Sequence, residues 1–140
     1  MDRDTFMRRA LAISVVYNLG AALLFAFPSS LLGRLAGLPV LVAPIYSTLL
    51  AFFVTLFAGA YAWLARQPYI DQPLVAFSAI GKAGAFSVIL MFWLYGQGSG
   101  RGVVAALGDL VLAGIFMWWL LGAQEDARRV NVSAADTRAG

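Results

Sequence analysis

Long apolar runs, separated by short segments rich in polar residues, glycine or proline, set the pattern of this chain. Four runs have about the 20 residues that a helix needs to cross a bilayer. They are Ala10–Phe27, Leu41–Leu64, Leu74–Tyr95 and Val103–Leu121. Because backbone groups in hydrocarbon must bond within their own segment, the runs predict an all-α fold. Short connections predict an integral membrane bundle of four antiparallel transmembrane helices, in one domain over residues 1–122.

The segments between the runs predict how the helices are joined. Pro28–Pro39 carries leucines at helical spacing together with Arg34, which favours a short amphipathic helix at the membrane interface. A plain hydrophobic loop is the alternative. Gly96–Gly102 is predicted to be a flexible turn, because it lacks the Lys-Ser/Thr ending of a phosphate-binding loop. Residues 123–140 are charged and rich in small side chains, and we expect a disordered polar tail.

The start of the chain has two interpretations. A basic segment, residues 1–9, precedes the first apolar run, as it does in a signal peptide. The run is longer than the apolar core of a signal peptide, about 7–15 residues. It also ends at Phe27 and Pro28, without the small residues of a cleavage site. We therefore expect a retained first spanning helix.

Composition strengthens the membrane interpretation and excludes several kinds of chemistry. The 140 residues are 61% hydrophobic and 12% charged, whereas soluble domains are about 45–50% apolar and about 25% charged. Cysteine and histidine are both absent. This excludes disulfides and His- or Cys-based nucleophiles, and argues against the common zinc, haem and iron–sulfur sites. No metal, cofactor or catalytic residue is therefore predicted.

The arginines are distributed unequally between the two sides of the predicted bundle. Two, Arg34 and Arg101, lie on one side, and seven lie on the side of the termini. Cytoplasmic loops carry the excess of Arg and Lys. We therefore expect a multi-pass protein of the cytoplasmic (inner) membrane with both termini in the cytoplasm. The net charge of +3 arises from this flanking pattern, and it does not indicate nucleic acid binding.

Among the polar residues within the apolar runs, four are candidates for a shared site, one from each predicted helix: Asn18, Thr55, Lys82 and Asp109. Asn18 and Lys82 lie roughly 12 Å from the cytoplasmic boundary, Thr55 lies near the same level, and Asp109 lies roughly 18 Å from it, at 1.5 Å per residue. A charge at such depth costs roughly 2.5–3.5 kcal/mol on insertion scales, so it needs a partner. We expect the four to point inward, and Lys82 to couple to Asp109 directly or through water, Asn18 or Ser87.

This intramembrane polar site has two main interpretations. It is a structural ion pair that fixes the register of the bundle, or a site for a proton, an ion or a small polar headgroup. The sequence slightly favours the structural interpretation, because no second carboxylate is near. A lysine Schiff base to a retinal-like ligand is a third interpretation.

Several short motifs occur through most of Ala10–Leu121: Tyr17-Asn18-x-Gly20-Ala21, Gly37-x-Pro39, Gly59-x-Tyr61, Gly81-Lys82 and Asp109. With these motifs the chain resembles small four-helix bacterial membrane proteins, loosely the DoxX-like family. The resemblance implies a four-helix bundle and no settled activity. A weaker resemblance is to sterol-isomerase-like four-helix proteins. Those enzymes use several intramembrane carboxylates, whereas Asp109 is alone here.

Taken together, the sequence favours a non-catalytic accessory or scaffold subunit of a membrane complex. The alternative is a binder or carrier of a small amphiphile or a proton, built around Lys82 and Asp109. A membrane isomerase or hydrolase that uses the same two residues is third. The expected partners are the lipid bilayer and either other membrane subunits or further copies of the chain.

Overall fold

The computed structural model describes residues 2–39 and 41–139, and the side chains among them up to residue 125. These residues form the helices α1 (Arg3–Ala26), α2 (Leu31–Leu35), α3 (Pro44–Arg66), α4 (Gln72–Leu94) and α5 (Gly100–Ala139), and the described ranges contain no strand. Helices α1, α3, α4 and the Gly100–Glu125 part of α5 are long and apolar enough to cross a membrane. The predicted all-α, four-helix membrane fold is confirmed.

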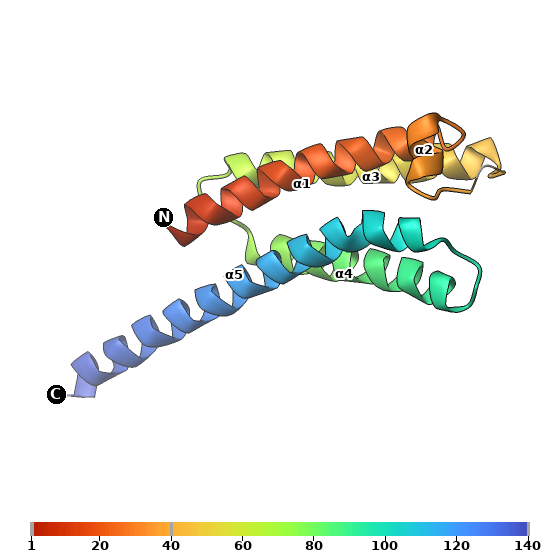
Figure 1. Ribbon diagram of the computed structural model, residues 1–140. Helices are drawn as coiled ribbons and strands as arrows, with labels where there is room; N and C mark the ends of the chain where they lie inside the picture. Colours follow the sequence, from red (N-terminus) through yellow and green to blue (C-terminus); the bar gives the residue numbers. More distant parts are fainter. Residues whose placement is uncertain (1, 40, 140) are drawn as a thin grey trace.

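The long helices pack as two antiparallel hairpins. Helix α1 runs along α3, and α4 runs along α5, while a smaller contact between α1 and α5 joins the two pairs. Figure 1 shows the α1/α3 hairpin above the α4/α5 hairpin, with the N-terminus at one end of the bundle. We call this the N-terminal end. Helix α2 and the α4–α5 connection lie at the opposite end.

An aspartate cap and a proline mark the starts of two of the long helices. Asp71 accepts a hydrogen bond from the backbone N–H of Leu74 at 2.8 Å, and so caps α4. Pro44 occupies the first turn of α3, where its missing N–H costs nothing. Apolar runs alone do not include these polar first turns. For that reason α1 begins at Arg3 and α4 at Gln72, earlier than the runs predict.

The first connection contains the short helix α2 rather than a plain loop. Ser30 caps it by accepting the backbone N–H of Gly33 at 3.1 Å. Gly33 is buried against the backbone carbonyl of Pro28, where a Cβ would not fit. The remaining side chains of α2, Leu31, Leu32, Arg34 and Leu35, are all exposed. This is the distribution expected of a helix at a membrane interface.

Helix α5 continues beyond the predicted end of the fourth spanning helix at Leu121. Figure 1 shows its C-terminal part projecting past the other helices. The predicted disordered tail, residues 123–140, is helical in its backbone up to Ala139, while its side chains from residue 126 on lie outside the described part. Residues 123–139 hold neither proline nor glycine and include several alanines, so no residue there breaks the helix.

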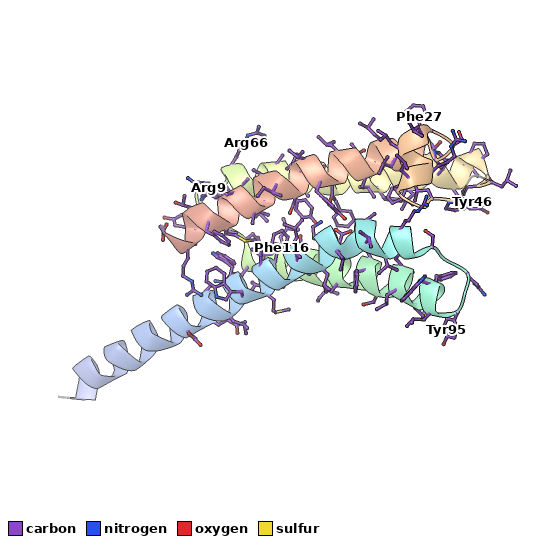
Figure 2. All side chains as sticks on the ribbon, in the orientation of Figure 1. Arg9, Phe27, Tyr46, Arg66, Tyr95 and Phe116 are labelled. Atoms are coloured by element: carbon purple, nitrogen blue, oxygen red, sulfur yellow. The ribbon has the colours of Figure 1, made fainter. Side chains whose placement is uncertain are left out.

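The apolar core fills the N-terminal end of the bundle. It contains the side chains of Met7, Leu11, Leu64, Val75 and Phe116, all fully buried and drawn from all four long helices. Figure 2 shows side chains filling the space between the hairpins near Phe116. In contrast, residues 83–94 of α4 include no buried residue. The two hairpins are therefore held together mainly at one end.

Arginine side chains tie the start of α1 to its neighbours at the N-terminal end. Arg8 donates to the backbone oxygens of Ala65 at 2.7 Å and Pro68 at 2.9 Å, and so satisfies carbonyls at the end of α3. Arg3 lies over the ring of Trp118, 5.2 Å from its centroid, and its guanidinium occupies the space where a Cβ of Gly122 would lie. These contacts fix α1 against both α3 and α5.

Candidate functional site

The ammonium group of Lys82 lies at the centre of the polar site. Its Nζ donates to Oδ1 of Asp109 at 2.7 Å and to Oδ1 of Asn18 at 3.1 Å. The Lys82 side chain is only 4% exposed, whereas that of Asp109 is 20% exposed. Helices α4, α5 and α1 therefore meet at a single positive charge.

Two tyrosine rings complete the surroundings of this charge. The Lys82 Nζ lies 5.2 Å from the ring centroid of Tyr17 and 5.3 Å from that of Tyr61. An ammonium over an aromatic face is attracted by the ring quadrupole, and more strongly where water is excluded. Since Tyr61 belongs to α3, all four long helices contribute to the Lys82 cluster. We use this name for Lys82, Asp109, Asn18, Tyr17 and Tyr61.

The helical period of α4 explains why Lys82 points into the bundle. Four residues of α4 are buried, at spacings of three, one and three positions: Val75, Ser78, Ala79 and Lys82. Residues spaced three or four apart share one face of a helix. The Ser78 hydroxyl donates to the backbone oxygen of Leu74 at 2.7 Å, so its proton is satisfied within its own helix. Lys82 is thus carried inward on the same face as the core.

Tyr17 docks α1 onto α5 beside the ion pair. Its hydroxyl donates to the backbone oxygen of Ala105 at 2.7 Å. Its ring lies so close to Gly108 that a Cβ built there would be 2.8 Å from Cζ of Tyr17. Glycine at position 108 therefore lets the ring approach the backbone of α5 next to Asp109.

Three of the four predicted polar residues come together, and Thr55 does not join them. Thr55 is exposed, and its Oγ1 donates to the backbone oxygen of Ala51 at 2.8 Å. It lines a shallow apolar groove on the α1/α3 hairpin instead. Because threonine can satisfy its hydroxyl within its own helix, its depth in the sequence does not force it inward.

No bridging group is required between Lys82 and Asp109. Side chains on antiparallel helices lean in opposite directions, but the long lysine stem allows direct contact. Ser87, one of the expected mediators, is exposed and donates to the backbone oxygen of Ala83 at 2.8 Å. Asn18, another expected mediator, accepts a hydrogen bond from Lys82 and so supplements the pair rather than bridging it.

Sequence reasoning missed the roles of Tyr17, Tyr61 and Gly108. Neither tyrosine is a site candidate in the sequence, where both stand only within the resemblance motifs. A usable signal is present for Tyr17, because it lies well inside its apolar run rather than at the interface where tyrosine concentrates in membrane proteins, whereas Tyr61 lies three residues from the end of its run. A buried tyrosine hydroxyl needs a hydrogen-bond partner, so it indicates a polar contact. Gly108 carries no such signal.

The buried polar groups of the cluster have partners within the chain. Within the described part of the chain, no buried side-chain nitrogen or oxygen lacks a hydrogen-bond partner. The same residues include no group of three acidic, His or Cys side chains that could hold a metal ion. A buried, hydrogen-bonded ion pair is suited to holding four helices in register.

The fold and this site define a class: a multi-pass helical membrane protein with an ion pair inside its bundle. In comparisons with known proteins, no family model, curated protein or solved structure matches the chain.

Disrupting the ion pair from one side is expected to destabilise the bundle. Lys82→Met or Asp109→Leu leaves an uncompensated buried charge, which typically costs about 3–5 kcal/mol. The double variant leaves no unpaired charge and should recover much of the loss. Melting temperatures in detergent measure all three variants. Strictly additive losses would show that the two charges do not interact.

Filling the position of Gly108 is expected to displace Tyr17. Gly108→Leu puts a side chain where the ring lies, and such overpacking typically costs about 1–3 kcal/mol. Gly114→Leu is the matched control on the same helix, because nothing lies within 4 Å of a Cβ there. The melting temperature should fall for the first variant and stay near wild type for the second. Equal melting temperatures would contradict the docking of Tyr17 onto α5.

Proposed function

We propose that this protein is a non-catalytic accessory or scaffold subunit of a membrane complex, with the Lys82 cluster as its internal clamp. The observation that carries the proposal is the enclosure of the Lys82 ammonium. It is bonded to Asp109 and Asn18, faced by two rings, and 4% exposed. A group so enclosed is suited to fixing helix positions rather than to meeting a substrate.

The outer surface supports a role in assembly. Five helical glycines have no atom within 4 Å of the position that a Cβ would take: Gly20, Gly59, Gly81, Gly84 and Gly114. They are not used for packing between the helices of this chain. Small residues on a lipid-facing surface let the backbone of another helix approach closely. The partner on this surface would be another membrane subunit or a second copy of the chain.

The proposed location is the bacterial inner membrane, with both termini in the cytoplasm. Arg8 and Arg66 lie at the N-terminal end of the bundle, and the less basic opposite end holds Arg34 and Arg101. This bias supports the orientation through the positive-inside rule. We also propose that the chain is related to the DoxX-like family, and this part of the proposal rests on the short sequence motifs alone.

A second candidate function is transfer of a proton or a small amphiphile by the same ion pair. The observation that favours it is the 20% exposure of the Asp109 side chain, beside a lysine that is 4% exposed. This carboxylate is the more accessible half of the pair. An isomerase built on Asp109 and Lys82 ranks third, because the sterol-isomerase-like pattern needs further intramembrane carboxylates.

The orientation is testable with single cysteines, because the natural chain has none. Gln97→Cys lies in the α4–α5 connection and Gln124→Cys lies near the cytoplasmic end of the span, and both positions are exposed. A membrane-impermeant maleimide should label Gln97→Cys in intact cells and Gln124→Cys only after lysis. The reverse pattern would overturn the proposed orientation.

Native mass spectrometry after gentle detergent extraction tests the proposed role. We expect a partner subunit or a second copy at fixed stoichiometry. Replacing Gly81 and Gly84 together by leucine should release it, with the melting temperature of the chain nearly unchanged. The Lys82→Met/Asp109→Leu variant should keep the partner. A monomer that carries a small molecule lost in this last variant would instead support the second candidate.

A further inference from the structure

A groove lies between the first connection and the start of α5, away from the Lys82 cluster. It has a volume of about 410 Å³. Its lining consists of Leu35, Ala36, Gly100, Arg101, Val104 and Ala105. One wall therefore belongs to the α1/α3 hairpin and the other to the α4/α5 hairpin. Apart from Arg101, the lining residues have apolar side chains or, in the case of Gly100, no side chain.

The groove has a charged end and an apolar end, ordered along the membrane normal. Arg101 is the second residue of α5, at the start of the Gly100–Glu125 span. Val104 and Ala105 follow about one turn later, roughly 4.5–6 Å deeper at 1.5 Å per residue. Arg101 is exposed, and it makes no hydrogen bond or ion pair with any side chain or backbone atom that the structure describes.

Contacts between the hairpins hold the two walls in place. The Ser99 hydroxyl donates to the backbone oxygen of Gly37 at 3.1 Å and accepts the backbone N–H of Gly102 at 3.1 Å. Gly37 has φ 79°, a left-handed conformation that favours glycine, and a Cβ there would lie 3.1 Å from Cβ of Arg101. The groove is therefore preformed rather than made by a mobile loop.

Aromatic side chains place the mouth of the groove at the level of lipid headgroups. Trp93 and Tyr95 lie at the same end of the bundle, with exposed fractions of 44% and 75%. Tryptophan and tyrosine concentrate at the boundary between hydrocarbon and water. The indole Nε1 of Trp93 also lies beside Gly100, 3.5 Å from the position that a Cβ on Gly100 would take. Arg101 is thus at the depth where phosphate groups lie.

We propose that this groove binds a glycerophospholipid. The phosphate accepts hydrogen bonds from the Arg101 guanidinium, whose planar fork matches phosphate oxygens. One acyl chain lies along Leu35, Val104 and Ala105. A free phosphate would leave the apolar part uncovered, and a purely apolar helix would leave the arginine without a counter-charge. A phospholipid satisfies both parts in the order in which the groove presents them.

Such a lipid would join the two hairpins at the end of the bundle that the core does not reach. Residues 83–94 of α4 include no buried residue, and two hydrogen bonds link the hairpins there, from Ser99 to Gly37 and from Tyr17 to Ala105. A ligand that binds the folded state alone raises its stability by mass action. This inference is independent of the proposed accessory role, because it concerns a different surface.

The test is a titration of the purified full chain in detergent with phosphatidylglycerol, followed by native mass spectrometry of retained lipid. Arg101→Gln should weaken retention about fivefold, as expected for one cation near a membrane surface. Arg101→Lys should keep most of the binding. Val104→Trp fills the apolar part and should reduce retention while Arg101 is intact. Arg66→Gln, an exposed arginine at the other end of the bundle, is the matched control and should bind like wild type.

Three results would overturn the proposal. The first is equal retention by Arg101→Gln and Arg66→Gln. The second is complete displacement of the lipid by soluble glycerol phosphate, which would indicate a site for free phosphate. The third is a dimer mass that Val104→Trp abolishes in the absence of lipid, which would assign the groove to a second copy. Lipid-free melting temperatures close to wild type establish that each variant is folded.

Discussion

The burial of one ammonium group is the constraint on which the rest of this structure depends. Lys82 is 4% exposed within a bundle whose helices are built to cross a membrane. Such a charge is tolerated only where it is paired and bonded. Its partners come from α1, α3 and α5, so each helix must keep its rotation and depth for the charge to be satisfied. A single lysine thereby links the positions of four helices.

The ion pair also separates two unlike halves of the bundle. Toward the N-terminal end lies the apolar core, with Phe116 against Tyr61 at 6.0 Å between ring centroids. Toward the opposite end the hairpins share little buried surface, and a loop contact at Gly37 joins them. At the end opposite the core, the bundle has few contacts of its own between the hairpins. A lipid or a partner helix bound there is therefore expected to stabilise it.

Glycine serves two different purposes in this chain. Gly108 and Gly122 face inward, where the ring of Tyr17 and the guanidinium of Arg3 occupy the space that a Cβ would take. The glycines of the outward set, such as Gly84, face open space. Composition shows that the helices are rich in small residues. It does not show which of them serve packing within the chain and which are left for contacts outside it.

The sequence by itself determined the number of spanning helices, because the length of an apolar run and the cost of unpaired backbone in lipid leave one solution. It also identified Lys82 and Asp109 as a pair, since each is the one charge of its sign within the predicted spans. Tertiary structure decided which neighbours join them. Asn18 and Thr55 have similar predicted depths, yet Asn18 is buried in the cluster and Thr55 faces outward. Depth follows from position in the chain, whereas the rotation of a helix follows from packing against all its neighbours at once.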